Sequence, residues 1–381
     1  MWEHAVATLA CPRCRARFTS KVIRDERLGS LESASGRPPA PGASDRWIED
    51  GALCCTTCKR LFPILGGVPL LLSYKTRLAE VAHGTWPASL RRELLNGGFH
   101  LSADQAPRGE KYVGATFSTE WKAYKYGPTL WTAPTADRLQ TFRGECGLKD
   151  GELSGKRFCE IGCGLGVLTN EASVGLGAEA WGMDVSTSVF RAAAHFKSNP
   201  HVHFVQASIF SAPFAPQTFD FVYSHGVLHH TWSTREGVRR AAELVHPTGS
   251  LYVWLYGYDD VRISRLRQLA FAVEKVTRPL ISRLPSPIAT ATLLPLIPLY
   301  QIASVLGKRS ATHGSVYSPR EALHAARDRL TPLFAHRHNF DEVASWFRES
   351  GLKTIHKVSG SEVSRSWALA IERNVAIRAR R

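Results

Sequence analysis

The stretch KRFCEIGCGLG, residues 156–166, decides the fold class because it joins a short apolar strand to a glycine-rich turn. The residues that follow, VLTNEASVGLG, fit a helix. Glycine is needed where a backbone approaches a ligand closely or takes angles that a side chain would forbid. Tight strand-to-helix turns use the same residues, so this turn predicts a ligand site only if its surroundings agree.

The surroundings favour a nucleoside ligand. A second strand is expected at residues 178–183, ending at Asp184, which comes 22 residues after Gly162. A carboxylate at this place can accept hydrogen bonds from ribose hydroxyls. Dinucleotide binding is the competing interpretation, but its fingerprint is GxGxxG, with a helix N-terminus facing pyrophosphate. Here the pattern is ExGxGxG, and Glu160 would repel pyrophosphate while suiting a cationic ligand or its amino group.

Five segments in sequence order resemble the S-adenosylmethionine-dependent class I methyltransferases: EIGCGLG, GMDV, HFVQASIF, TFDFVYSHGVLHH and LVHPTGS, over about residues 155–256. The resemblance implies an α/β fold with a Rossmann-like seven-stranded sheet and S-adenosyl-L-methionine as cofactor. The family often has Asp where this chain has Ser208, and a hydroxyl is a weaker acceptor for the adenine amino group than a carboxylate. With the strand ends, the resemblance assigns cofactor binding to Glu160, Gly162, Gly164, Gly166, Asp184, Ser208, Ile209 and Ser224.

The strand TFDFVYS is expected to end near Ser224 and His225, so the loop HGVLHH would lie at the carboxyl edge of the sheet, where ligands bind in open α/β folds. His225 and His229 are the candidate general bases, although such histidines can also serve only to orient a loop. Tyrosines near the strand ends are candidate polar groups of the pocket: Tyr223, Tyr256 and Tyr258. Phe117, Trp121 and Tyr124 fit one face of a helix, as core or, with Tyr256, as a cap over substrate or cofactor.

Two cysteine pairs, Cys11-Pro-Arg-Cys14 and Cys55-Thr-Thr-Cys58, have the spacing of zinc knuckles, and together they supply the four ligands of a structural zinc site. Cys54 could replace Cys55 but lacks the two-residue spacing to Cys58, and a redox pair is the alternative use. With the tail LFPILGGVPLLL, these pairs resemble the small zinc-ribbon activator of RNA and protein methyltransferases, over about residues 5–75. The resemblance implies docking on the methyltransferase core.

Composition excludes a fibrous or wholly disordered chain, since 44% of the residues are hydrophobic and 21% are charged. The net charge of +15 is uneven: residues 261–381 hold 20 Lys and Arg against 8 Asp and Glu, and residues 1–260 hold 28 against 25. Such an excess indicates nucleic acid, an anionic membrane or an acidic substrate, or reflects only a bias towards Arg. Sparse cysteines and an N-terminus without a basic or apolar leader predict a cytoplasmic protein.

The C-terminal third contains an insertion with two interpretations. It holds the Arg-rich segment VRISRLRQLAFAVEKVTRPLISRL and the apolar segment Ile288–Leu306, which two prolines interrupt and which predicts a buried or interfacial helix rather than a membrane span. The insertion is either a lid over a substrate pocket or an amphipathic patch on a membrane surface. After it, DEVASWFRESG is expected as the last helix, and KTIHKVSG and SWALAIER as the last two strands.

We therefore expect five units: a zinc-ribbon domain at 1–75 with a disordered loop at about 29–46, a helical linker and N-terminal cap at 76–150, a cofactor-binding core at 151–260, a helical substrate-cover insertion at 261–338, and the closing helix and last strands at 339–381. The function expected is a methyltransferase acting on an O or N atom of a small molecule, such as a specialised metabolite, a sugar or a lipid-linked compound. The alternatives are an RNA or protein methyltransferase with a fused activator, and a non-catalytic zinc-bearing scaffold.

Overall fold

A seven-stranded sheet forms the centre of the protein, which was analysed as a computed structural model describing residues 1–28, 45–127, 129–130, 133–258, 265–308 and 317–381. Its strand order is β10-β9-β8-β11-β12-β14-β13, parallel from β10 to β12 and antiparallel at β14 and β13. This confirms the α/β fold expected from the sequence. The strands are β8 (Arg157–Ile161), β9 (Glu179–Asp184), β10 (Val202–Gln206), β11 (Phe219–His225), β12 (Val245–Leu255), β13 (Lys353–Lys357) and β14 (Val375–Arg380).

Helices cover both faces of this sheet, so its strands carry apolar side chains on both sides. On one face, buried residues of the strands pack with α7 (Thr234–Glu243) and α12 (Phe340–Glu349). On the other, they pack with α4 (Thr135–Cys146), α5 (Val167–Val174), α6 (Ser188–His195) and α13 (Arg365–Glu372). Successive residues of β8 show the alternation, because Phe158 belongs to the second cluster and Cys159 to the first.

One expected strand is wrong. SWALAIER forms helix α13, and the last strand lies further on, at Val375–Arg380. Its alternating apolar residues fit a strand, but a segment of eight residues fits a helical period as well. Its two alanines favour a helix. In this helix the side chain of Ile371 is buried against the sheet. In β14, Val375, Ile377 and Ala379 are buried in the cluster on the other face.

The N-terminal unit is a small antiparallel sheet that holds the cysteine pairs. Its elements are η1 (Glu3–Thr8), β1 (Thr19–Arg27), β2 (Arg46–Cys54), β3 (Arg60–Leu65) and β4 (Val68–Pro69). Residues beyond 75 also join it. β5 (His100–Leu101) pairs with β3 in parallel, and α2 (Ala88–Asn96) packs against the sheet through Leu94, beside Trp86, which lies between α2 and α1 (Arg77–Gly84). Most of the loop predicted at about 29–46 lies outside the described residues.

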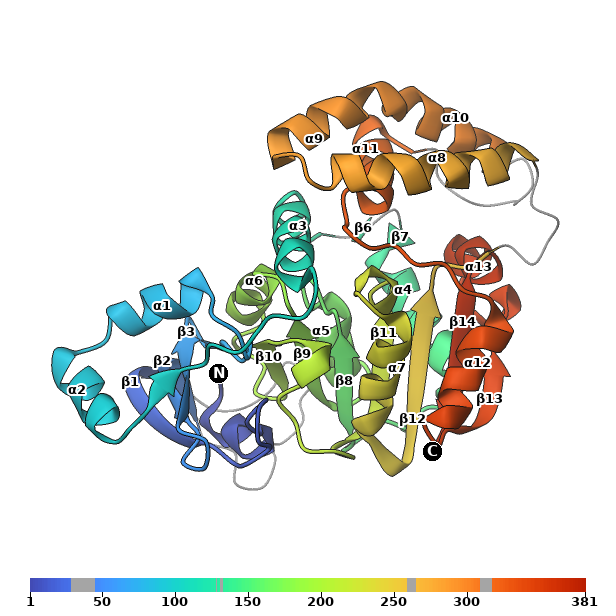
Figure 1. The fold of residues 1–381 in the computed structure, drawn as a ribbon. Coiled ribbons are helices and arrows are strands. Elements are labelled where there is room, and N and C mark those ends of the chain that lie inside the picture. Colours follow the sequence, from blue (N-terminus) through green and yellow to red (C-terminus); the bar gives the residue numbers. More distant parts are fainter. Residues whose placement is uncertain (29–44, 128, 131–132, 259–264, 309–316) are drawn as a thin grey trace.

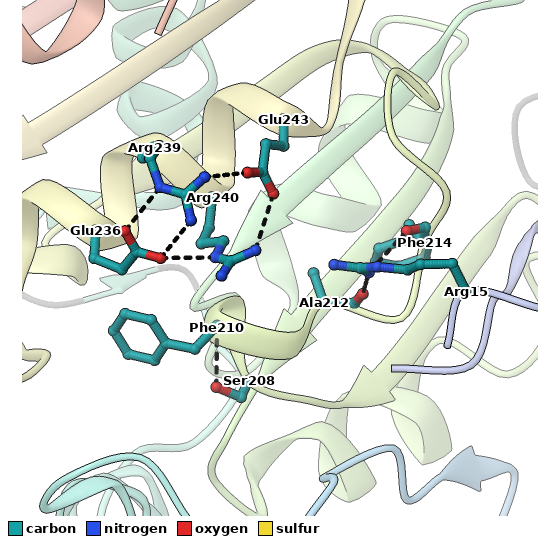
Figure 2. Close-up of polar contacts among 9 residues, drawn as sticks. All are labelled: Arg15, Ser208, Phe210, Ala212, Phe214, Glu236, Arg239, Arg240 and Glu243. Atoms are coloured by element: carbon teal, nitrogen blue, oxygen red, sulfur yellow. Dashed lines mark hydrogen bonds and ion pairs between the residues drawn. The ribbon is translucent and has the colours of Figure 1, made fainter. Parts of the chain in front are cut away.

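This unit is joined to the edge of the large sheet. The backbone N–H of Leu71 donates to the carbonyl of Gln206 at the end of β10 (2.8 Å), and Ala10 donates to Pro213 (2.9 Å). The guanidinium of Arg15 donates to the carbonyl oxygens of Phe214 (3.1 Å) and Ala212 (Figure 2). Side chains of both units share one buried cluster. The N-terminal unit is therefore packed on the core by both backbone pairing and apolar burial.

The insertion forms a helical layer beyond the carboxyl edge of the sheet. Its helices are α8 (Arg265–Ile281), α9 (Ser286–Leu293), η4 (Leu294–Leu296), α10 (Ile297–Lys308) and α11 (Pro319–Leu330). Figure 1 shows α8, α9 and α10 grouped at the top of the molecule, with α11 running from this group towards the sheet. Leu293, Ala326 and Leu330 form a small buried core between these helices. The insertion thus has packing of its own, separate from the two clusters of the sheet.

Replacing Arg15 with Met should weaken the attachment of the N-terminal unit. The change removes two hydrogen bonds from a cation to carbonyl oxygens, which together contribute about 2 kcal/mol or more to stability. Thermal unfolding of the full chain measures the loss. Arg17→Met at an exposed neighbouring position is the matched control, and equal midpoints for the two variants would contradict the assigned role of Arg15.

Candidate functional site

A cavity of about 240 Å³ lies at the carboxyl ends of β8, β9, β11 and β12. Helix α3 (Glu110–Lys122) forms one wall, and the end of α11 with the loop that follows it forms another. The cavity brings together predicted residues from six separate segments of the sequence. The predicted residues among its lining are Phe117, Trp121, Glu160, Gly162, Asp184, Ile209, His225 and Tyr256.

The glycine turn leaves no room for side chains at its first two glycines. Gly162 and Gly164 have φ angles of +77° and +53°, which other residues rarely adopt. A Cβ added at Gly162 would lie 2.2 Å from the side chain of Val227, and one at Gly164 would lie 2.4 Å from the ring of Trp121. The loop after β11 and helix α3 therefore close directly on the turn, as a cap that reaches the glycines.

Asp184 is held as an acceptor at the end of β9. Its Oδ2 accepts from the backbone N–H of Gly164 (2.9 Å), and its Oδ1 accepts from the N–H of Ser186 (2.8 Å). Burial raises the pKa of this carboxyl, and the backbone donors of Ser186 and Gly164 oppose that shift. Each carboxylate oxygen has a further lone pair, so Asp184 can still accept from a ligand hydroxyl in the cavity.

Glu160 lies at the end of β8, on the cavity wall. Its Oε2 accepts a hydrogen bond from the hydroxyl of Thr169 (2.5 Å). Burial raises the pKa of Glu160 to about 7, against the effects of Thr169 and Arg138. A carboxyl with such a pKa becomes charged readily when a cationic group comes next to it, because an opposite charge favours the ionised form.

Ser208 does not line the cavity, but its hydroxyl holds the carboxyl of Glu110, which does. This hydroxyl donates to Oε2 of Glu110 at 2.5 Å. The same hydroxyl accepts from the N–H of Phe210 at 3.1 Å, the contact that Figure 2 shows. Glu110 begins α3, lines the cavity and is buried, and its Oε1 has no hydrogen-bond partner among the described residues. Burial raises the pKa of Glu110 to about 7. A carboxyl absent from position 208 is thus supplied by Glu110.

Three other predicted cofactor residues lie outside or behind the cavity. Gly166 packs on the ring of Phe204, so that an added Cβ would meet that ring at 2.4 Å. Gly164 acts through its backbone N–H, as described above. Ser224 is fully buried in β11, and its hydroxyl has no partner among the described residues. These positions shape the turn and the strand end rather than the cavity surface.

His225 lies at the end of β11 and lines the cavity, stacked on the ring of Trp254 at 4.6 Å between centroids. Its Nδ1 lies 2.9 Å from Oε1 of Glu145, a residue of α4 that is completely buried. Burial lowers the pKa of His225, although Glu145 acts to raise it. The imidazole is therefore neutral near pH 7, and Nε2 is the nitrogen left to face a ligand.

Arg138 keeps Glu145 charged behind the histidine. Burial would raise the pKa of Glu145, but Arg138 and His225 outweigh it and lower that pKa to about 2. The guanidinium of Arg138 donates to Oε2 of Glu145 (3.1 Å), and the hydroxyl of Tyr223 donates to the same oxygen (2.6 Å). Arg138 also lines the cavity, with its guanidinium over the ring of Trp367. The result is a buried ion network with one histidine at its open end.

Glu110, Arg138 and Glu145 were missed by the sequence analysis. All three come from helices before the glycine turn, in segments that carry no motif. Charged residues are usually exposed, so a pattern gives no reason to place them in a core. A partial signal existed for Glu110, because Ser208 lacked the carboxylate that the family resemblance leads one to expect.

The remaining predicted residues, apart from Tyr256, do not line the cavity. His229 is buried and stacks on Tyr256 at 4.0 Å, and its neighbour His230 lines the cavity instead. Tyr124 follows the end of α3 and packs on His324 at 4.8 Å. Tyr223 is buried behind the cavity in the Glu145 network, and Tyr258 is exposed. Tyr256 does line the cavity, with its hydroxyl bonded to Asp328.

The four predicted metal ligands are gathered in the N-terminal unit. The Sγ atoms of Cys11, Cys14, Cys55 and Cys58 all lie within 4.8 Å of one another, with Cys11–Cys58 at 3.6 Å and Cys14–Cys55 at 3.3 Å. Sulfurs bound to one tetrahedral zinc at about 2.3 Å are separated by about 3.8 Å. Cys54 points instead into the apolar contact with α2, and burial raises its pKa to about 11. The set of four thiols fits zinc, and Cys54 is outside it.

Comparison with known proteins links the central unit to methyltransferases. Residues 159–253 match the family model of a methyltransferase domain. Ubiquinone biosynthesis O-methyltransferase of Burkholderia orbicola (strain MC0-3) is 34% identical over 103 residues, which are 26% of this chain and 44% of that protein. The protein of the same name from Aromatoleum aromaticum (strain DSM 19018 / LMG 30748 / EbN1) is 36% identical over 104 residues, again 26% and 44%. This chain spans less than half the length of these relatives.

Solved structures are similar at low identity. Phosphoethanolamine N-methyltransferase 2 of Haemonchus contortus in complex with S-adenosyl-L-methionine has 13% identity and a TM-score of 0.41, over 72% of this chain and 56% of that chain. Magnesium protoporphyrin IX methyltransferase of Synechocystis PCC 6803 has 15% identity and a TM-score of 0.42, over 71% and 97%. Similarity at this level carries no argument about the acceptor.

The cysteine cluster predicts one zinc ion per chain, measurable by elemental analysis of the purified protein. Cys14→Ser should lower the zinc content and lower the thermal midpoint by several degrees, because a structural zinc contributes directly to folding. Cys54→Ala is the matched control and should keep the full zinc content. Unchanged stability of the wild-type protein after removal of metal by a chelator would contradict the assignment.

The His225–Glu145 pair predicts a histidine that titrates below the ordinary pKa of about 6.5. In Glu145→Gln the carboxylate that raises the pKa is gone, so the pKa of His225 should move lower still. NMR of protein labelled at histidine carbons measures both values, with His225→Gln used for assignment. A pKa of 6.5 or above in the wild type, or no movement in Glu145→Gln, would contradict this geometry.

Proposed function

We propose that the protein is an S-adenosyl-L-methionine-dependent methyltransferase that acts on an oxygen atom of a small, largely apolar molecule. One observation carries the proposal: the cavity has the glycine turn and two acidic strand ends on one side and the neutral imidazole of His225 on the other. The match of residues 159–253 to a methyltransferase domain supports the transfer chemistry. The names of the curated relatives support oxygen rather than nitrogen as acceptor.

The cavity residues fit the cofactor by charge and by shape. Asp184 has lone pairs left for ribose hydroxyls, and Glu160 suits the amino group of the amino-acid moiety. Glu110, whose Oε1 has no partner among the described residues, suits the adenine amino group beside Ile209. Trp121 lies against the glycine turn and offers an aromatic face to a cation. When bound there, the cofactor supplies a methyl group activated by a sulfonium.

His225 provides what an oxygen acceptor needs in addition. A hydroxyl must lose its proton as its oxygen is methylated, and a neutral imidazole can take that proton at Nε2. Glu145, at 2.9 Å from Nδ1, fixes the ring and stabilises the imidazolium that results. Glu145 is thus a positioning residue. The rest of the acceleration comes from alignment of the acceptor and exclusion of water by the aromatic walls.

The lining suggests the kind of acceptor. Trp254 and Trp367 pack against His225, and Trp232 and Phe334 also line the cavity. Arg138 adds a cation that is already paired with Glu145. Aromatic walls favour a flat, apolar acceptor over a strongly hydrated one. A phenol combines such a ring with a hydroxyl that a base can deprotonate, and we infer that phenols are the substrate class.

The N-terminal unit would have a structural role as a fused equivalent of the separate zinc-ribbon activator. This proposal is supported by its backbone pairing to the end of β10 and by the buried cluster shared with the core. The paired strand end is Gln206, two residues before Ser208, which holds Glu110 in place. The unit would therefore stabilise the adenine side of the cavity without contributing a reacting group.

Cofactor binding should depend on Asp184 and Glu110, two of the acidic residues that line the cavity. Asp184→Asn and Glu110→Gln should each weaken binding of S-adenosyl-L-methionine by about tenfold or more, because each loses charged hydrogen bonds to the ligand. Isothermal titration calorimetry measures the dissociation constants. Asp341→Asn, at an exposed position on α12, is the control and should bind as the wild type does.

Absence of cofactor binding by the wild-type protein would overturn the proposed function. The acceptor class has its own test, in which transfer of a labelled methyl group is followed with a panel of phenols and the matched anilines. We expect transfer to phenols, and a strong fall in His225→Gln with cofactor affinity retained. Transfer to anilines alone, or equal rates in His225→Gln, would contradict the role assigned to the histidine.

A further inference from the structure

The outer surface of the insertion is unusually apolar for residues in contact with water. Large aliphatic side chains are exposed on α8, on the segment that follows α8, and on α9, η4 and α10. Val276 and Leu280 have exposed fractions of 70% and 66%. The apolar surface, as we call it, consists of Leu269, Val273, Val276, Leu280, Leu284, Ile288, Leu294, Leu299, Ile302 and Val305. Patches of this kind usually mark a site of interaction.

Helix α8 has its polarity reversed relative to an ordinary surface helix. Leu269, Val273, Val276 and Leu280 follow a spacing of four, three and four residues, so they form one stripe along the helix. This stripe is exposed. The inner face carries Glu274, which is buried and paired with Arg278 and with Arg337 from the loop after α11. A helix that buries an ion pair, Glu274 with Arg278, and exposes a stripe of aliphatic side chains is arranged for an apolar environment.

The rest of the apolar surface has the same character. By length and composition alone, Pro287–Val305 could cross a membrane. Only 11% of this apolar stretch is buried inside the protein. Of the two alternatives expected for Ile288–Leu306, a buried or an interfacial helix, this exposure fits the interfacial one and not the buried one. Leu293 on α9 does pack into the small core with α11. The segment is thus held flat against the protein by one face, with the other face open, as in helices that lie on a membrane surface.

These residues do not serve the cavity. Among the described side chains of α8, α9 and α10, none lines it, whereas Asp328 on α11 and Phe334 after α11 do. The interpretation of the whole insertion as a lid with an apolar inner face therefore applies to α11 and the loop that follows. The aliphatic side chains of α8 to α10 need another partner.

Charge distinguishes between the possible partners. Residues 265–308 contain six Lys and Arg and one acid, and that acid is the buried, paired Glu274. Lys275 and Arg283 are exposed beside the stripe of α8. A second copy of this chain would bring the same basic surface and be repelled. An anionic lipid surface offers both hydrocarbon for the aliphatic side chains and negative charge for the basic ones.

We propose that the apolar surface docks the protein on an anionic lipid bilayer as a peripheral membrane protein. Figure 1 shows α8, α9 and α10 at one extreme of the molecule, so the sheet and the N-terminal unit would remain in water when these helices lie on the bilayer. Helix α11 joins the docked layer to the cavity wall. The docking rests on the insertion alone and does not depend on the proposed methyl transfer.

The test uses the full chain with lipid vesicles of two compositions, phosphatidylcholine alone and phosphatidylcholine with about one third phosphatidylglycerol. Cosedimentation should show strong binding to the anionic vesicles, weaker binding to the neutral ones, and a decrease with salt. The double variant Val276→Glu, Leu280→Glu should lose about tenfold or more of the binding to anionic vesicles. The matched control is Leu95→Glu on α2, equally exposed at 70% but on the N-terminal unit, which should bind as the wild type does.

A charge-reversal variant, Lys275→Glu with Arg283→Glu, should lose the preference for anionic vesicles. Unchanged calorimetric binding of S-adenosyl-L-methionine in these variants would show that folding and the cavity are intact, so a failure of docking stays separate from a failure of the proposed function. The proposal is overturned if the wild type binds neither vesicle, or if the double variant binds as well as the wild type. It is also overturned if the wild type is a dimer in solution that the double variant converts to monomers.

Discussion

The close packing of two side chains, Val227 and Trp121, on the backbone of residues 162–164 is the constraint on which the cavity depends. Gly162 lies against Val227 and Gly164 against Trp121, with no space for a Cβ at either glycine. The turn therefore fixes the loop after β11 on one side and helix α3 on the other. Glu110 at the start of α3 and His225 at the end of β11 take their places in the cavity as a result. A side chain at Gly162 would displace the loop after β11, and one at Gly164 would displace helix α3.

The chemistry of the cavity depends on three buried carboxyl groups whose neighbouring side chains differ. Glu160 and Glu110 each have a hydroxyl as the nearest partner, and burial raises the pKa of each to about 7. Glu145 is equally buried but lies against Arg138, and its pKa falls to about 2. The first two carboxyls can respond to a cationic ligand, whereas the third is a fixed charge that orients His225. Burial alone raises the pKa of a carboxyl, and a cation next to the buried carboxyl lowers that pKa instead.

The sequence predicted what short, contiguous patterns encode. The strands around EIGCGLG and GMDV, the end of TFDFVYS at His225 and the grouping of four cysteines all depend on local spacing, and the structure has them where expected. Residues that act across long separations were missed: Glu145 reaches His225 over 80 positions of sequence, and Glu110 reaches Ser208 over 98. No period or spacing encodes such contacts, because they depend on how α3 and α4 pack on the sheet. The strand predicted for SWALAIER was wrong for a local reason, because eight residues are too few to distinguish the period of a helix from that of a strand.

Helix α11 of the insertion connects the wall of the cavity to the inner side of the apolar helices α8 and α9. Helix α11 carries Asp328 into the cavity, where it bonds Tyr256, and it carries Ala326 and Leu330 into the small core under α9. Arg337, from the loop after α11, is paired with Glu274 on the inner face of α8 and lies 5.3 Å from the ring centroid of Tyr256. Because the cavity wall and the underside of the apolar surface share these residues, a shift of α8 relative to the sheet must alter the pairing of Arg337 or the position of α11. This wall of the cavity is therefore built on the same contacts that hold the apolar helices in place.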